Sequence, residues 1–335
     1  MKKMFVILFT CISVFTKAQD IHFSQFFASP LTTNPSYTGA FDGDYRIGGD
    51  YRGQWSSVPV PYHTVAAYGD MAFHKQGPNH FYPAAGLSLQ HDVAGDGNLQ
   101  MNKVFVSGAV YYGFDKFKTN TLALGIQVGL VQKSIDFPKL YFGNQWDEIA
   151  FDTHLPTGEP AIAEQLMYPD VSIGASFNYG MSDVINWHAG FSLSNVNQPT
   201  ETFYSGAVNQ IGMRPQISAG ATVVLNDEWM VHPSAFYETQ KSASEFLMGS
   251  LVSYQIETSG VDSRIYAGAF LRSMDAVIAA AGYEVNNLRI IVSYDITTSQ
   301  LQSYNHGRGA GEISLVYYGS FWHNNSLMDM PCPRF

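Results

Sequence analysis

The feature that most constrains the fold of this chain is a regular alternation of apolar with small or polar residues over long segments. In residues 122–130 the large apolar side chains all fall on one face of an extended chain, and residues 170–180 repeat the pattern. About 9–11 tilted strand residues cross a bilayer, whereas strands are usually only about 5–6 residues long. The alternation therefore predicts an all-β fold, a transmembrane antiparallel β-barrel.

The composition favours the same class of protein. Charged residues make up 14% of the chain, against about 25% in typical soluble proteins, while aromatic residues also reach 14% and glycines number 30. After the first 18 residues, no apolar run is long enough to form a membrane-spanning helix. A barrel accounts for both observations because its spanning segments show alternation instead of continuous hydrophobicity.

We predict a barrel of about fourteen strands over residues 45–321. Pro233 lies inside the ninth strand and cannot donate a ladder hydrogen bond, so we expect a bulge or a rim position there. The tenth segment does not show which of its faces is apolar. The expected strands are 46–55, 62–73, 83–92, 101–114, 121–134, 170–180, 186–195, 214–226, 229–238, 245–257, 262–272, 275–285, 288–296 and 310–321.

The lengths of the connections indicate how the barrel is oriented. The longest ones, 135–169, 196–213 and 297–309, follow the fifth, seventh and thirteenth strands, so they lie at one end of an up-and-down barrel. Two of the tightest, 226–228 and 286–287, lie at the other end. Outer-membrane barrels have short periplasmic turns and long outer loops, so we expect the long connections to face the outside of the cell.

The start of the chain indicates export from the cytoplasm. Residues 1–18 read as a signal peptide, with two lysines, an apolar run and a small-residue cleavage site. Removing its three lysines from the 18 basic residues leaves 15 against 28 acidic ones, which argues against nucleic acid as a partner. Only Cys332 then remains, so we expect no intrachain disulfide and no cysteine-based metal site.

The aromatic, turn-rich segment 19–44 needs a place to bury its side chains. Its three phenylalanines at 23, 26 and 27 are spaced as on one face of a short helix. We predict that the segment folds into the lumen as a plug, and a partner-binding site is the alternative. The candidate residues for these roles are Gln19, His22, Phe23, Phe26, Phe27 and Trp55.

The alternation also predicts charges inside the barrel, near the seam where the last strand pairs with the first. We expect the six of them to be neighbours. They would form a structural salt-bridge network, or else they would anchor a plug or line a narrow path. The predicted lumen charges are Arg46, Asp50, Arg52, Arg289, Asp295 and Glu312.

The last residues, 322–335, should form a periplasmic tail, because two prolines prevent a strand there. A docking site is one interpretation of this tail and a frayed end is the other. The candidate docking residues are Cys332, Pro333, Arg334 and Phe335.

Nothing in the sequence indicates covalent chemistry. The ten histidines are scattered, and neither Gly-x-Ser-x-Gly nor His-Glu-x-x-His occurs. Asp92, Asp96 and Asn98 could offer oxygens to calcium, but a hairpin turn built on Asp96-Gly97 explains the segment more simply. We therefore expect no enzyme, no cofactor and no metal.

Short segments over the whole mature chain resemble the PorP/SprF family of outer-membrane proteins of the type IX secretion system in Bacteroidota. The residues that carry the resemblance are Gln19-Asp20, residues 22–26, Asn34-Pro35 with Gly39, Tyr51-Arg52 with Gln54-Trp55, residues 94–97, residues 129–136 with Gln145-Trp146, Pro233-Ser234, residues 293–295, residues 307–310 with 312–314, and residues 332–335.

The resemblance implies a barrel that assists export or surface anchoring of a large adhesin-like cargo protein, which carries a C-terminal secretion domain. It also implies outer-membrane lipid as a partner, together with periplasmic ring, motor or peptidoglycan-linking components. Loops 135–169 and 196–213 are the expected cargo-facing surfaces, because loops on a rigid frame tolerate variation. The alternative function is a diffusion channel for small or apolar solutes, which requires an open lumen.

Overall fold

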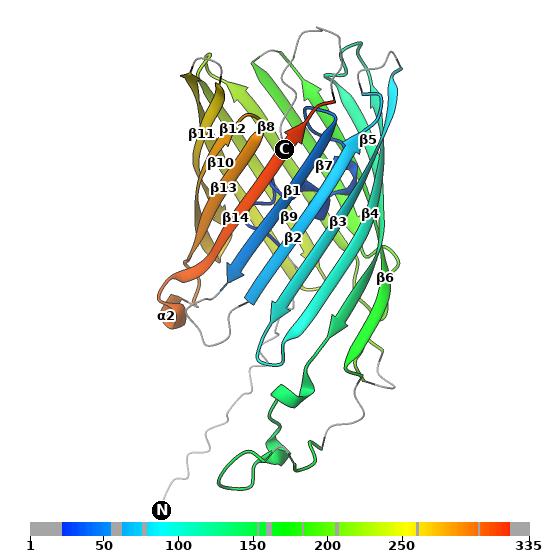
Figure 1. Cartoon of the computed structure of the whole chain (residues 1–335), viewed down its shortest axis with the longest axis vertical. Helices are drawn as coiled ribbons and strands as arrows, with labels where there is room; N and C mark the ends of the chain where they lie inside the picture. Colours follow the sequence, from blue (N-terminus) through cyan, green and yellow to red (C-terminus); the bar gives the residue numbers. More distant parts are fainter. Residues whose placement is uncertain are drawn as a thin grey trace, which may run out of the picture.

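Fourteen antiparallel strands close into one barrel in the computed structural model, which confirms the predicted fold class (Figure 1). Consecutive strands are hydrogen-bonded to each other, and β1 pairs with β14 to close the sheet. Closure removes the free strand edges, which is the condition for a sheet to cross a hydrocarbon layer. The structure describes residues 22–54, 62–75, 79–152, 154–158, 163–182, 184–204, 208–258, 261–300 and 302–321.

The observed strands overlap the expected ones throughout, and most of their bounds differ by only a few residues. They are β1 (Tyr45–Gln54), β2 (Tyr62–Ala72), β3 (Phe81–Ala94), β4 (Leu99–Gly113), β5 (Thr121–Ser134), β6 (Gln165–Gly180), β7 (Ile185–Ser194), β8 (Arg214–Val224), β9 (Trp229–Gln240), β10 (Ala243–Thr258), β11 (Val261–Arg272), β12 (Ala276–Val285), β13 (Leu288–Thr297) and β14 (Arg308–Gly319). The helical elements are short: α1 (Pro30–Thr33), η1 (Pro35–Tyr37), η2 (Phe137–Lys139), η3 (Gly143–Gln145) and α2 (Gln302–Asn305). None of the helices in the described ranges is long and apolar enough to cross a membrane.

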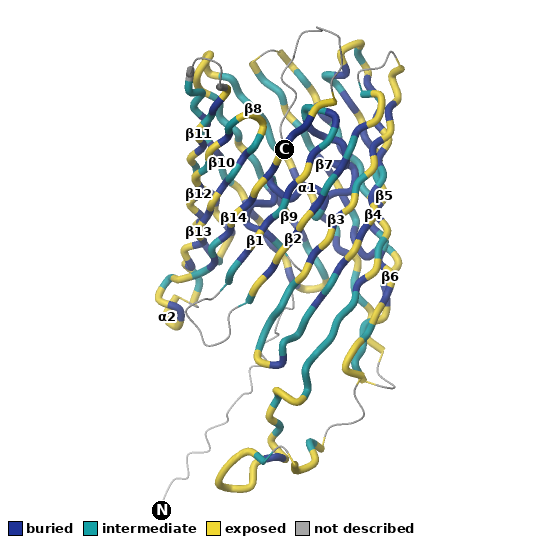
Figure 2. Tube along the Cα trace, viewed as in Figure 1, coloured by how far each residue is buried: buried dark blue, intermediate teal, exposed yellow. Residues whose placement is uncertain are grey.

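The two faces of the sheet differ as the alternation requires. In β5, Leu124 and Ile126 are 61% and 51% exposed on the outer face, whereas Ala123 and Gln127 are buried in the lumen. Buried and exposed positions alternate along the strands all round the barrel (Figure 2). The outer face, which is rich in large apolar residues, is the lipid-facing one.

The connections are unequal at the two ends of the barrel. The β5–β6 connection, residues 135–164, carries η2 and η3 and extends far beyond the strands at the bottom of Figure 1. Connections 195–213 and 298–307 lie at the same end, because each follows an odd-numbered strand. We call this end the long-connection end, and the opposite end, which includes the 286–287 turn, the short-turn end.

Pro233 interrupts the β8–β9 ladder without forming the expected bulge. The pairing runs from Gln216–Glu238 to Gly220–Ser234 and resumes at Val223–Val231, so the register is unchanged. Pro233 faces lipid, and across the gap the side chains of Thr222 and His232 contact each other at 3.2 Å. A side-chain contact thus bridges the gap that the missing N–H leaves in the ladder.

Residues 22–44 lie inside the barrel. Phe23 and Phe26 are buried and Phe27 is half-buried, but residues 24–28 form turns, so the expected helix over 23–27 is wrong. The backbone N–H groups of Ser24 and Gln25 donate to the Glu312 carboxylate on the wall. These two N–H groups join the start of the segment to β14, far away in the chain.

A charge on the outer face should destabilise the barrel according to its depth. Val128→Arg, at the middle of β5, should lower the free energy of unfolding by about 2–4 kcal/mol, because arginine is poorly solvated in hydrocarbon. Phe117→Arg, in the β4–β5 turn, should cost only about 0–1 kcal/mol. Reversible unfolding in urea with lipid vesicles measures both, and equal costs would contradict the depth assigned to Val128.

Candidate functional site: the N-terminal segment against the lumen wall

The segment 22–44 runs along the lumen from one end of the barrel to the other. His22 Nε2 lies 3.7 Å from the carboxylate of Glu245, near the start of β10 at the long-connection end. Asp44 donates its backbone N–H to the carbonyl of Gly319 at 2.8 Å, at the short-turn end. The segment is therefore in contact with the wall over the length of the strands.

An apolar patch of the lumen wall, formed by residues of β9 to β13, receives Phe26 and Phe27 of the segment. The rings of Phe26 and Phe236 stack at 5.4 Å, and those of Phe27 and Phe270 at 5.3 Å. Burying each such side chain contributes roughly 1.5–3 kcal/mol. The same cluster also contains Leu247, Leu251, Tyr266, Ile278, Ala280 and Ile291.

This apolar patch explains why the tenth strand did not show a single apolar face. Leu247 and Leu251 point into the lumen and are buried, whereas Phe246 and Met248 are exposed on the lipid side. Both faces of β10 are apolar because the lumen there is filled by aromatic rings instead of water.

The opposite side of the lumen is a notch of glycines on β5, β6 and β7, into which the turn at Asn34 fits. Asn34 Oδ1 accepts the Ser36 N–H at 2.9 Å, and Asn34 Nδ2 donates to backbone carbonyls of β6 and β7 at 3.3 Å. A Cβ at Gly174 would overlap Asn34 Oδ1, and one at Gly125 would overlap the backbone of Pro35. The wall therefore lacks side chains where the backbone of the segment comes closest.

A buried ion pair holds the segment near the short-turn end. Arg46, on β1, donates to Asp70, on β2, through Nε at 3.0 Å and Nη2 at 2.8 Å. Arg46 Nη2 also donates to the carbonyl of Tyr37, and Asp70 accepts the Gly39 N–H at 2.7 Å. The guanidinium lies 4.8 Å from the centre of the Phe41 ring. The pair thus joins three parts of the segment to the first two strands.

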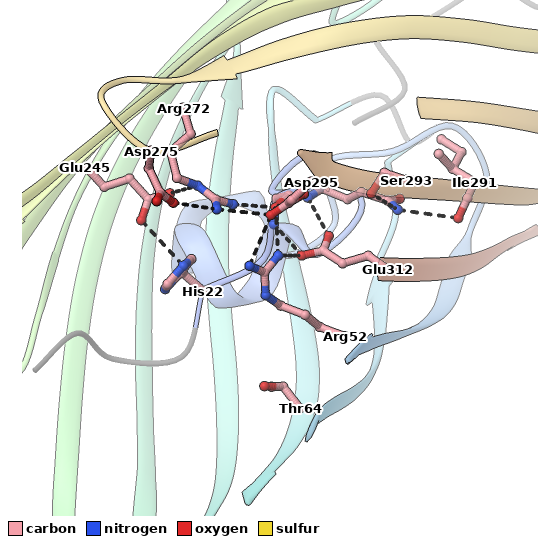
Figure 3. A network of polar contacts seen from close by, with 12 residues as sticks. His22, Arg52, Thr64, Glu245, Arg272, Asp275, Ile291, Ser293, Asp295 and Glu312 are labelled. Atoms are coloured by element: carbon pink, nitrogen blue, oxygen red, sulfur yellow. Dashed lines mark hydrogen bonds and ion pairs between the residues drawn. The ribbon is translucent and has the colours of Figure 1, made fainter. Parts of the chain in front are cut away.

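A second charged cluster, which we call the Ser24 cluster, surrounds the start of the segment (Figure 3). The Ser24 hydroxyl lies between Arg52, Arg272 and Asp295, and donates to the Asp295 carboxylate at 2.8 Å. Each guanidinium also contacts Asp295 directly, at 3.1 Å from Arg52 and 3.0 Å from Arg272. The remaining carboxylates of the cluster belong to Glu245, Asp275 and Glu312.

The segment supplies part of the charge compensation in this cluster. Two guanidiniums face four carboxylates, so the wall alone leaves an excess of negative charge. Backbone N–H groups of Ser24 and Gln25 donate to Glu312 at 2.7 and 2.9 Å, and hydrogen bonds to charged groups contribute about 1.5–3 kcal/mol each. Within the described ranges, no group of His, Cys, Asp or Glu could hold a metal ion.

The chain is similar to several solved structures. The monoaromatic hydrocarbon channel CymD has a TM-score of 0.50 at 8% identity, covering 89% of this chain and 94% of that one. A FadL homologue from Pseudomonas aeruginosa has a TM-score of 0.49 at 10% identity, covering 87% and 94%. The Ralstonia pickettii toluene transporter TbuX has 0.49 at 7% identity, covering 86% and 92%. At these identities the likeness concerns the fold alone. No curated protein matches the chain.

A family model shows to which protein family the chain belongs. The model of the type IX secretion system membrane protein PorP/SprF matches residues 15–317. The chain belongs to the PorP/SprF family. The family and the closed barrel together place it in the outer membrane, as predicted. The family description names a membrane protein of a secretion system and no catalytic activity.

The six predicted lumen charges of this PorP/SprF barrel all lie inside it, but they are not all neighbours. Arg52, Asp295 and Glu312 meet in the Ser24 cluster. Arg46 pairs instead with Asp70, and Arg289 pairs with Glu284 at 2.9 Å. The Asp50 carboxylate is also buried but lies outside these ion pairs. The expectation of one group was wrong because Arg52 lies six positions after Arg46, a distance of about 20 Å along β1.

Four charged residues that bind a predicted charge or the segment in the PorP/SprF lumen were missed by the sequence reasoning. Asp70 and Arg272 share the inward face of their strands with buried Tyr68 and Phe270, so the alternation that found Arg46 also identifies them. Glu245 lies on β10, whose inward face the sequence did not show. Glu284 lies on β12 and was not among the predicted lumen charges. The candidates Gln19, Trp55, Cys332, Pro333, Arg334 and Phe335 lie outside the described residues.

Filling the glycine notch should dislodge the segment. Gly174→Ala places a methyl group against Asn34, so we expect ion conductance through the purified barrel in planar bilayers to rise above that of the wild type. Gly108→Ala is the matched control, because its Cβ faces lipid and meets nothing nearer than the Ala84 carbonyl at 3.8 Å. An unchanged conductance in folded Gly174→Ala barrels would contradict this role of the notch.

Removing an arginine from the Ser24 cluster should leave buried carboxylates without a neighbouring positive charge. Arg52→Met should lower the free energy of unfolding by about 3–5 kcal/mol, the usual cost of breaking a buried ion pair from one side. Lys139→Met, which removes an exposed pair with Asp136, should cost at most about 1 kcal/mol. Urea unfolding measures both, and a small effect of Arg52→Met would show that the cluster is solvated.

Proposed function

We propose that this PorP/SprF barrel retains a large type IX cargo protein at the cell surface by binding it, without catalysis and without conducting solutes. The observation that carries the proposal is the occupied lumen. Segment 22–44 contacts the wall from His22 to Asp44 and is held by aromatic packing, the glycine notch and two charged clusters. In this proposal the segment acts as a plug, so the function lies on the outer surface.

The long connections are the proposed cargo-binding surface. Outer-membrane barrels keep short turns in the periplasm, so we assign the long-connection end to the outside of the cell. Connections 135–164 and 195–213 lie there on a rigid frame, and they contact each other where the Ala163 N–H donates to the Phe203 carbonyl at 2.8 Å. A large cargo could therefore bind both connections at once.

The short-turn end would face the periplasm in this orientation. It is the end at which β14 stops, at Gly319, and from which residues 322–335 continue. Contacts with ring, motor or peptidoglycan-linking components are proposed for this end, and outer-membrane lipid for the apolar outer face. Family membership and the proposed orientation support these proposed partners.

A diffusion channel for small or apolar solutes is the second candidate function. The observation that favours it is the apolar lumen face from β9 to β13, which could receive an apolar solute. In the described structure this face is in contact with Phe26 and Phe27 of the segment. Transport along it therefore requires the segment to move.

Two measurements on the full-length protein test the proposal. We expect the purified barrel to show almost no conductance in planar bilayers, because the segment fills the lumen. We expect deletion of residues 137–158 to reduce the cargo that copurifies with a tagged barrel in mild detergent, and deletion of residues 300–305 in the β13–β14 connection to leave it unchanged.

The two measurements can fail separately. A stable open-channel conductance of the wild type would favour the diffusion channel. Unchanged cargo recovery after deletion of residues 137–158, in a barrel that still folds and reaches the outer membrane, would exclude this connection as the binding surface.

A further inference from the structure

We propose that residues 145–152, which we call the loop hairpin, are a preformed docking element for a protein whose apolar pocket is bordered by lysine or arginine. The proposal rests on the proposed function, since it names the part of the β5–β6 connection that would contact the cargo. Three observations support it: the internal hydrogen bonds of the loop hairpin, its exposed apolar tip and the acidic residues around that tip.

The loop hairpin is held in shape by its own hydrogen bonds. Trp146 and Phe151 form an antiparallel bridge, and the Asp147 N–H donates to the Ala150 carbonyl at 3.0 Å. The Asp147 carboxylate accepts the N–H groups of Ile149 and Ala150 at 2.9 and 2.7 Å. A loop ordered before binding loses less conformational entropy when a partner docks.

Buried Gln145 fixes the base of the loop hairpin to the rest of the connection. Its Nε2 donates to the Leu155 carbonyl at 3.2 Å, and its Oε1 accepts the Phe142 N–H at 3.1 Å. The Gln145 carbonyl accepts the Asp152 N–H at 2.8 Å. The two ends of the loop hairpin, Gln145 and Asp152, are therefore hydrogen-bonded to each other, which keeps the tip in a defined orientation.

Large apolar side chains are concentrated at the tip. The rings of Trp146 and Tyr141 both pack on Phe151, at 5.0 and 5.3 Å. Yet Trp146 remains 49% exposed, Tyr141 64% and Ile149 85%. Tryptophan and tyrosine are enriched among the residues that dominate binding energy at interfaces, and an exposed cluster of this kind indicates a contact site.

The charge around the tip defines the chemistry of the partner. Asp147, Glu148 and Asp152 surround the apolar residues, and the nearby Lys139 is paired with Asp136 at 3.1 Å. The backbone N–H groups of Ala150 and Ile149 lower the pKa of Asp147 below its usual range, so this carboxylate stays charged at neutral pH. A basic border on the partner complements this surface.

The position and charge of the loop hairpin argue against two other occupants. It extends beyond the strands along the barrel axis, away from the lipid-facing wall (Figure 1). A second copy of the chain would bring an equally acidic hairpin, and like charges placed together are unfavourable. We therefore commit to a protein partner of complementary charge.

Point variants in the full-length barrel test the inference, with the cargo that copurifies with the wild type as the probe. Trp146→Ala and Ile149→Ala should each weaken its binding about tenfold or more, as for residues that dominate an interface. Tyr304→Ala is the matched control, because Tyr304 is 83% exposed at the same end of the barrel but lies on α2. The charge-reversal variant Glu148→Lys should weaken binding most at low salt.

The outcomes separate this inference from the proposed function. If deletion of residues 137–158 abolishes binding but Trp146→Ala and Ile149→Ala do not weaken it, the loop hairpin is not the docking element and the proposed function stands. If neither the deletion nor the variants change binding, both proposals fail. If the variants instead abolish a dimer of the purified barrel, the hairpin joins copies of this chain, and the inference is overturned.

Discussion

The width of a fourteen-stranded barrel is the constraint on which the rest of this structure depends. Barrels of about eight strands are filled by their own side chains, and those of 16–18 strands keep an aqueous channel. Fourteen strands leave a lumen that inward side chains do not fill, and on the β5–β7 side they are small: Gly125, Gly174 and Gly190 all lie against the segment. Residues 22–44 occupy this space, so the fold of the segment is determined by the shape of the wall.

The charged groups of the lumen position the segment, while the aromatic packing stabilises it. Breaking a buried ion pair from one side is costly, but the whole pair contributes little over an apolar substitute, because both charges must be desolvated. The Ser24 cluster and the Arg46–Asp70 pair therefore contribute mainly to specificity. They bind backbone N–H and carbonyl groups at defined points of the segment, at Ser24, Tyr37 and Gly39. Phe26 and Phe27 supply the apolar burial between these points.

The sequence predicted the strands well because each alternating segment carries its own signal, independent of its neighbours. It predicted the inward direction of Arg46, Asp50 and Arg52 for the same reason. It failed where the result depends on a partner far away in the chain. Turns replace the helix expected over 23–27, and this stretch is bound by Glu312, which is distant in the sequence. The tenth strand stayed ambiguous because its inner neighbours include Phe26.

Except in the tenth strand, the sequence by itself determined which residues face lipid and which face the lumen, because the two-residue period of a strand assigns each side chain to one of two faces. It also determined the up-and-down order and the unequal lengths of the connections. Only the tertiary structure decided at what height along the lumen each charge lies and which residue it meets. Height and partner depend on strand register and on the path of segment 22–44, and a period of two carries no information about either. For this reason Arg46 pairs with Asp70 at one end of the barrel, while Arg52 joins Asp295 and Glu312 near the other.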